Sequence, residues 1–152
     1  MSDVLQRIVA QRSIRLADMQ QHYPEPEISA AAAKFTLQRR PRSLKAHLAA
    51  QRPGFILECK KASPSKGLIR ESFDPVDIAR TYAPYAAAIS VLTEPDFFQG
   101  SFSYLQAVRQ QVQVPVLCKD FIFTRYQVAL ARYFDADAIL LMLSILNDEE
   151  YL

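Results

Sequence analysis

Glycine, cysteine and tryptophan are scarce in this chain, which has three glycines, two cysteines and no tryptophan among 152 residues. A glycine-rich phosphate loop of the GxGxxG or Walker type is therefore absent, which disfavours a nucleotide-binding fold. Cys59 and Cys118 each lie in the middle of a predicted strand. We expect two buried free thiols, rather than a disulfide or a metal site, in a reducing compartment.

Long apolar runs and runs of one charge are lacking as well. The longest apolar stretch, AILLMLSIL at 138–146, is too short to span a bilayer. Residues 1–20 contain charges and no continuous apolar centre, so no signal peptide is predicted. The 18 basic and 16 acidic residues are interspersed, without the basic stripe of a nucleic-acid-binding face. We expect a cytoplasmic protein with no membrane and no nucleic-acid partner.

Strand and helix patterns alternate through residues 53–152, whereas residues 1–52 are predicted to form a helical extension. The strands are rich in Ile, Val and Leu on both faces, which is typical of a parallel sheet covered by helices. Two closures fit, a doubly wound open sheet and a (β/α)₈ (TIM) barrel, and polar residues at several strand ends favour the barrel. Strands are expected at 55–61, 88–93, 115–121 and 138–146, and helices at 2–21, 44–51, after Asp74, at 101–112 and from Thr124 to Phe134.

Only the first four βα units of such a barrel are predicted here. A complete barrel needs about 250 residues, and the chain ends in the opening turn of its fourth barrel helix. Half a barrel leaves its inner face and two sheet edges uncovered. We therefore expect residues 53–152 to be the first half of a barrel, with a C-terminal half-barrel as its missing partner.

Two lysines within strands indicate a site. They lie in the segments FILECKKASPSKG and VPVLCKDFIF. Successive strand residues point to opposite faces. Glu58 and Lys60 therefore share a face of the first predicted strand, and Lys119 and Phe121 share a face of the third. Charged groups are costly to bury unpaired, so these cations predict an anion-binding or catalytic pocket. Asp120 points the other way and is expected to pair with a helix or loop.

These segments resemble indole-3-glycerol-phosphate synthase, a TIM-barrel enzyme. The resemblance covers essentially the whole chain and is specific, because several ordered motifs agree at family-like spacing. The chain looks most like the bifunctional form that is fused to phosphoribosylanthranilate isomerase. Beside the two lysine segments, the motifs are ISVLTEPDFFQGS and DAILLMLSIL, together with the N-terminal helices.

The resemblance implies a carboxy-lyase of tryptophan biosynthesis that needs no metal and no organic cofactor. Its substrate is the phosphorylated anthranilate–ribulose adduct 1-(2-carboxyphenylamino)-1-deoxyribulose 5-phosphate, whose indole ring is closed with loss of CO₂ and water. By position, Lys119 matches the general acid. Lys60 matches the lysine that binds the substrate's anionic groups, and Glu58 matches the glutamate that orients Lys60.

The substrate-binding residues follow from the same resemblance. Phe98, Phe121 and Leu140 match residues that line the slot for the anthranilate ring, and Ser63 lies on a mobile loop that closes over the substrate. The family's fifth-strand glutamate, sixth-strand asparagine, seventh-strand Glu-Ser pair and glycine-rich phosphate cradle have no counterpart in this chain. We therefore expect these 152 residues alone to be inactive.

Other interpretations stay open. Glu58 and Lys60 are also compatible with a structural ion pair, and the aromatic residues with an ordinary core. A different phosphate-binding barrel enzyme would share a lysine on its first strand. A non-catalytic half-barrel would act as an assembly module through its free strand edges.

Overall fold

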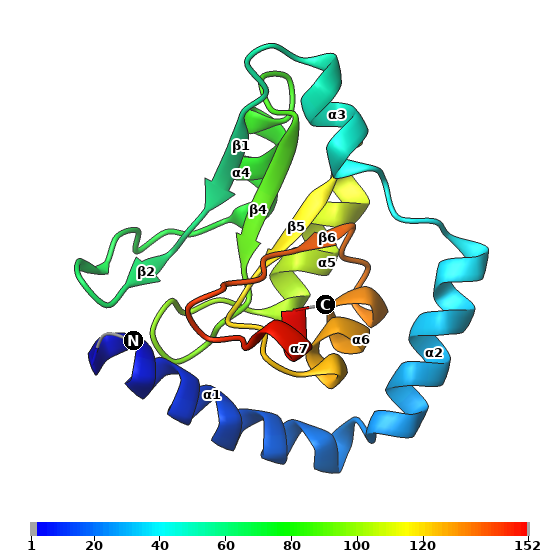
Figure 1. Cartoon of the computed structure of the whole chain (residues 1–152). Helices are drawn as coiled ribbons and strands as arrows, with labels where there is room; N and C mark the ends of the chain where they lie inside the picture. Colours follow the sequence, from blue (N-terminus) through cyan, green and yellow to red (C-terminus); the bar gives the residue numbers. More distant parts are fainter. Residues whose placement is uncertain (1–2, 152) are drawn as a thin grey trace.

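The computed structural model describes residues 3–151, which build a parallel sheet of four strands with helices on one face (Figure 1). The strand order is β1-β4-β5-β6, so consecutive strands of the main sheet lie side by side, and the sheet is not closed. The elements are α1 (Asp3–His22), α2 (Glu25–Gln38), α3 (Leu44–Ala50), β1 (Ile56–Cys59), β2 (Ala62–Ser63), β3 (Gly67–Leu68), α4 (Pro75–Tyr82), β4 (Ala88–Leu92), α5 (Phe102–Gln111), β5 (Val116–Lys119), α6 (Arg125–Tyr133), β6 (Ala138–Ile139) and α7 (Asp148–Tyr151).

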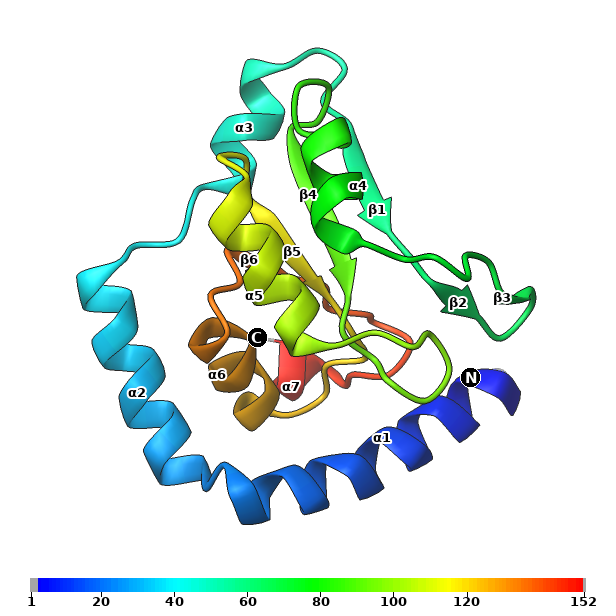
Figure 2. The same cartoon turned by 180° about the vertical axis from the view of Figure 1, so that it is seen from behind.

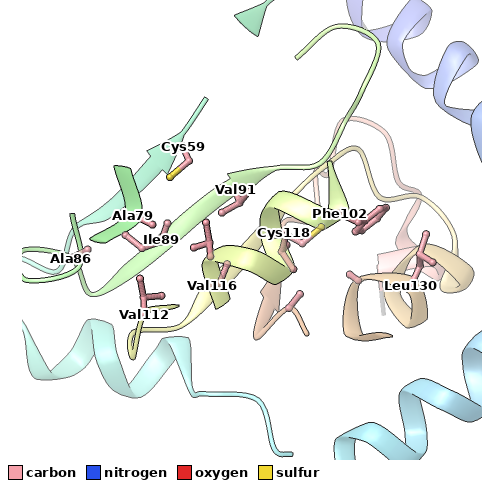
Figure 3. Close-up of a cluster of buried hydrophobic side chains, with 14 of the residues drawn as sticks. Cys59, Ala79, Ala86, Ile89, Val91, Phe102, Val112, Val116, Cys118 and Leu130 are labelled. Atoms are coloured by element: carbon pink, nitrogen blue, oxygen red, sulfur yellow. The ribbon is translucent and has the colours of Figure 1, made fainter. Parts of the chain in front are cut away.

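The two faces of the sheet differ in chemistry. One face packs against the helices and forms the hydrophobic core, which includes both cysteine side chains (Figure 3). On the other face, Glu58 of β1 is in register with Ser90 of β4, and Ser90 is in register with Leu117 of β5. The helix-facing core residues of the strands are Cys59, Ile89, Val91, Val116 and Cys118.

Side-chain caps begin the helices that connect the strands. The carboxylate of Asp74 accepts hydrogen bonds from the first backbone N–H groups of α4, and Pro75 occupies the first helical turn, where its missing N–H costs nothing. Thr124 and Gln127 form a reciprocal capping box at α6. The helix starts predicted at Asp74 and Thr124 are confirmed.

The strand predicted at 138–146 is wrong beyond Ile139, because β6 has only two residues and a turn follows at 143–145. In the described residues β6 has a neighbour on one side only, β5, so few backbone hydrogen bonds extend it. The prolines at 24 and 26 end α1 but also begin α2, which the sequence prediction did not include. After β1 the chain forms a hairpin of β2 and β3, which includes Ser63, a residue expected on a loop.

The N-terminal helices run around the sheet. Figure 1 and Figure 2 show α1 across the carboxyl ends of the strands, α2 beside α6, and α3 near the opposite end. The hydroxyl of Tyr126 donates to the backbone oxygen of Tyr23 at 3.0 Å, and Arg132 Nη2 donates to the backbone oxygen of Arg39 at 2.6 Å. The predicted helix start at Ser2 lies outside the described residues. Within residues 3–151, no helix combines the length and apolar character that a membrane span requires.

Candidate functional site

One carboxylate on the face away from the helices contacts two ammonium groups. Glu58 Oε1 lies 3.1 Å from Lys60 Nζ, and Glu58 Oε2 lies 3.3 Å from Lys119 Nζ. Ser90 Oγ donates to Oε2 at 3.4 Å. Both amines therefore lie on the same side of the sheet, and we call Glu58, Lys60 and Lys119 the lysine cluster.

The position of the lysine cluster follows from strand order. Strands β1 and β5 are separated by β4, which places the small Ser90 opposite Glu58. A serine leaves room for the Lys119 side chain to reach across to Glu58. Because the strands are parallel, Lys119 ends β5 at the same edge of the sheet where the chain leaves β1 at Lys60. Ligand sites of parallel sheets form at this carboxyl edge.

The charges of the lysine cluster favour anion binding. Burial by itself raises the pKa of Glu58, but the positive charge of Lys119 and the hydrogen bonds from Lys60 and Lys119 outweigh it, so the pKa lies below its ordinary value. Glu58 is therefore ionised at neutral pH, and two ammonium groups against one carboxylate leave one net positive charge. The side chains of Lys60 and Lys119 are 39% and 33% exposed, so both can reach a ligand.

An apolar cavity of about 180 Å³ adjoins Lys119. The rings of Phe98 and Phe121 both line it and contact each other in a tilted arrangement, with centroids 5.9 Å apart. We call this cavity the ring slot, because it offers aromatic walls beside a cation. It is lined by Leu92, Phe98, Lys119, Asp120, Phe121, Leu140 and Met142.

A larger cavity of about 570 Å³ lies elsewhere, between α6 and the segment that follows β6. Its lining includes Ile139, Leu141 and Leu146 and contains no lysine. It lies at the edge of the sheet rather than beside the lysine cluster. Of these two cavities, the smaller ring slot is the one that adjoins the lysine cluster.

The loop after β4 carries Phe98 into the ring slot, and a buried carboxylate shapes that loop. Glu94 has no exposed surface, and its oxygens accept hydrogen bonds from the backbone N–H groups of Asp96, Phe97 and Phe98 at 2.8–3.0 Å. No role was predicted for Glu94 from the sequence. The available signal was a carboxylate two residues after an apolar strand, which is buried along its whole length.

Gly100 lies near the end of the same loop, where the loop packs against the end of β4. Its backbone N–H donates to the oxygen of Glu94 at 2.8 Å. A Cβ at this position would lie 2.3 Å from the backbone oxygen of Leu92, closer than real Cβ contacts come. Only glycine fits, so the loop follows one path back to β4.

Asp120, next to Lys119, pairs with a helix as predicted. Its carboxylate accepts two hydrogen bonds from Arg12 of α1, at 2.7 and 3.0 Å. It also accepts from Thr93 Oγ1 at 2.6 Å and from the backbone N–H of Phe121 at 2.8 Å. No functional role was predicted for Arg12 from the sequence.

The structure brings together all but one of the predicted site residues. Glu58, Lys60 and Lys119 meet in the lysine cluster, and the three predicted slot residues line the ring slot. Ser63 instead lies buried in β2 of the hairpin, and it is not among the residues that line the ring slot. In the described part of the chain, no group of three His, Cys, Asp or Glu side chains is arranged to hold a metal ion.

The fold and the site together define an α/β protein with a cationic, partly aromatic pocket at the carboxyl ends of parallel strands. The chain belongs to the indole-3-glycerol phosphate synthase family, whose model matches residues 5–152. The resemblance predicted from the sequence motifs is confirmed.

Curated relatives extend well beyond this chain. The tryptophan biosynthesis protein TrpCF of Salmonella typhi is 50% identical over 151 residues, which cover 99% of this chain and 32% of that protein. The protein of the same name from Haemophilus influenzae is 49% identical over 151 residues, covering 97% and 31%. That of Vibrio cholerae is 67% identical over 97 residues, covering 64% and 21%. The chain spans at most about a third of the length of these relatives.

Proposed function

We propose that this chain forms the first half of the barrel of an indole-3-glycerol-phosphate synthase and supplies its general acid. The observation that carries the proposal is the double role of Lys119, which contacts Glu58 in the lysine cluster and also lines the ring slot. A substrate ring packed against Phe98 and Phe121 in the ring slot would thus lie beside an ammonium group. The family match supports the same reaction.

The reaction joins the substrate's carbonyl carbon to the aromatic carbon that bears its carboxylate. Lys119 donates a proton to the carbonyl oxygen as the new carbon–carbon bond forms, and CO₂ leaves from the aromatic carbon. Protonation of the resulting hydroxyl then lets water depart, and the neighbouring CH₂ carbon loses a proton to a base in the remainder of the enzyme, which completes the indole. General acid catalysis of this kind contributes about 10²–10⁴-fold in rate.

The other residues hold the substrate. Lys60 carries the positive charge that binds the substrate's anionic groups, and Glu58 keeps both ammonium groups directed at the site. The walls of the ring slot, Phe98, Phe121 and Leu140, hold the anthranilate ring by apolar contact. Ser63, on the hairpin after β1, would meet the substrate only if the hairpin moves towards the site.

We propose further that residues 53–152 pair with a second half-barrel belonging to the same longer protein, and that residues 1–52 form an N-terminal extension of that barrel. Two observations support this partner. Strands β1 and β6 are the edges of the sheet in the described residues, and apolar side chains near them are exposed, 43% for Ile56 and 69% for Leu143. The relatives are about three times as long as this chain.

The test joins this chain to the part of the Salmonella typhi relative that lies beyond the matched region; we call the product the joined protein. Turnover is followed by the fluorescence of the indole product formed from the anthranilate–ribulose adduct. We expect turnover by the joined protein and none by the 152-residue chain alone. A joined protein that is folded by circular dichroism yet forms no indole product would contradict the proposal.

A non-catalytic assembly module is the second candidate, favoured by the same exposed edges. In that case the 152-residue chain would form a discrete dimer, in which β6 of one copy pairs with β1 of another. Sedimentation equilibrium distinguishes the two, because an incomplete barrel would give a monomer or polydisperse aggregate. The family match does not favour the other alternative, a different phosphate-binding barrel enzyme.

A further inference from the structure

An arginine of the first helix is buried beside the ring slot. Arg12 is 1% exposed and makes a two-point ion pair with Asp120, which is 108 residues away in sequence. Its guanidinium also lies 5.9 Å from the centre of the Phe102 ring. It falls on the buried stripe of α1, one turn after Ile8 and one turn before Leu16. An arginine on an apolar stripe needs a partner, because an unpaired buried charge is strongly destabilising.

The partner carboxylate lies between two residues of the site. Asp120 follows Lys119 and precedes Phe121, and it binds the backbone N–H of Phe121 at 2.8 Å. Through Thr93 Oγ1 it is also tied to the end of β4 at 2.6 Å. Fixing this carboxylate therefore fixes the short backbone segment that directs Lys119 and Phe121. Arg12 has no direct contact with either side chain in the described interactions.

A second arginine of α1 contacts the loop that carries Phe98. Arg15 Nη2 lies 2.7 Å from Asp96 Oδ1, and Arg15 Nε lies 3.1 Å from both carboxylate oxygens. Asp96 belongs to the loop that carries Phe98, and its own backbone N–H is bound by Glu94. The Arg15 side chain is 49% exposed, so this contact is the weaker of the two.

We propose that α1 is a positioning element of the synthase site. Arg12 acts through Asp120 on Lys119 and Phe121, and Arg15 acts through Asp96 on the loop that carries Phe98. The proposal rests on the proposed function. A misplacement of about 1 Å in a reacting group can cost about 10²-fold in rate, so a helix that touches no substrate can control turnover.

The chain contains a matched control for a purely structural ion pair. Arg109 of α5 pairs with Asp137 at 2.7 Å and 3.0 Å, with side chains 2% and 0% exposed. Asp137 also accepts from the backbone N–H of Val116, the first residue of β5. This pair is as buried as that of Arg12 but lies at the opposite end of the strands from the ring slot. It should contribute to stability without positioning the site.

The test compares Arg12→Lys with Arg109→Lys in the joined protein, at a temperature where both are folded. Both variants should have a lower urea midpoint, because lysine cannot make the two-point contact of arginine. We expect kcat to fall about tenfold or more for Arg12→Lys, with a smaller change in KM, and to stay within about twofold for Arg109→Lys. Equal effects on kcat, or none for Arg12→Lys, would overturn the proposal.

A second variant guards against a misfolded Arg12→Lys protein. Arg15→Gln changes a half-exposed side chain and should leave the urea midpoint nearly unchanged. We expect its KM to rise severalfold with kcat nearly constant, because Phe98 only holds the ring. An unchanged KM would remove the Arg15 arm of the proposal.

Amide hydrogen exchange separates failure of this proposal from failure of the proposed function. In the joined protein, Arg12→Lys should speed exchange at the Phe121 N–H relative to Ile89 in β4, whether or not indole forms. Faster exchange in a protein whose wild type lacks turnover would leave the positioning role of Arg12 intact and refute the synthase. If the exchange rate of the Phe121 N–H were unchanged in Arg12→Lys while the wild-type joined protein formed indole, only the positioning role of Arg12 would be refuted.

Discussion

Lys119 and Glu58 are 61 residues apart in sequence, yet the Lys119 amine lies 3.3 Å from the Glu58 carboxylate across an intervening strand. The contact depends on β4, which lies between their strands and carries the small Ser90 opposite Glu58. The same amine also borders an aromatic cavity. One strand end therefore supplies both an ammonium group of the lysine cluster and part of the lining of an aromatic cavity.

Removing the Lys119 amine should abolish most turnover. In the joined protein, we expect Lys119→Ala to lower kcat about 10²–10⁴-fold, the usual loss for a general acid. Steady-state kinetics of indole formation provide the measurement. The control is Lys61→Ala, which removes a neighbouring lysine outside the lysine cluster. If Lys119→Ala retained nearly wild-type kcat, Lys119 would not be the acid.

Neutralising Glu58 should have a smaller effect on turnover. Glu58→Gln keeps the shape of the side chain but removes the charge that directs Lys60 and Lys119. We expect kcat to fall about tenfold, less than for Lys119→Ala, because the proton donor itself remains. The two variants are compared under the same conditions. A larger loss for Glu58→Gln would assign the proton transfer to the carboxylate.

The lowered pKa of Glu58 predicts how its contribution to stability depends on pH. Burial opposes the shift, but Lys119 and Lys60 outweigh it. A carboxyl whose pKa is lowered in the folded state stabilises the protein at pH values above its unfolded pKa of about 4.3. This contribution to stability is lost as the pH falls through the folded pKa. The urea midpoints of wild type and Glu58→Gln should therefore differ most above the unfolded pKa of Glu58 and converge as the pH falls below it. A constant difference would show that Glu58 is not linked to folding in this way.

Removing the buried carboxylate of Glu94 should loosen the loop that carries Phe98. Glu94→Ala leaves three backbone N–H groups without their acceptor. We expect the free energy of unfolding to fall by about 3 kcal/mol and KM to rise in the joined protein. Urea unfolding and steady-state kinetics measure the two effects. The exposed Glu71→Ala is the control, and equal stability of the two variants would contradict the assigned role.

Both cysteine thiols should be unreactive in the folded protein. Burial raises the pKa of Cys59 to about 12, with a further contribution from the charge of Glu58. Burial likewise raises the pKa of Cys118 to about 12, with a further contribution from the charge of Asp120. Since the thiolate is the reactive form, a thiol reagent should label neither residue until denaturant is added, and both afterwards. Rapid labelling of Cys59 or Cys118 in the folded joined protein would contradict their buried positions.

Local signals explain what the sequence analysis predicted correctly about the fold. The caps at Asp74 and Thr124 bond to backbone groups within a few residues, so their effect can be recognised from a short segment. The length of β6 depends instead on its neighbours in the sheet, and a run of apolar residues at 138–146 carries no information about them. Proline likewise ends one helix and begins the next, and composition alone does not separate the two roles.

The site was predictable to the extent that strand alternation governs it. Alternation places Glu58 and Lys60 on one face, whereas the contact of Lys119 with Glu58 also requires the order of the strands. The role of Arg12 was not predicted, because its partner is more than a hundred residues away. Its position on the apolar stripe of α1 was the available signal.

The absence of a side chain at position 100 has a consequence for redesign. At Gly100 the loop that follows β4 lies directly against the backbone of Leu92, where even a methyl group would clash, so the loop cannot shift towards β4 at this position. Enlarging the cavity is therefore more practicable by trimming the phenylalanine at position 98 than by remodelling the backbone that presents it.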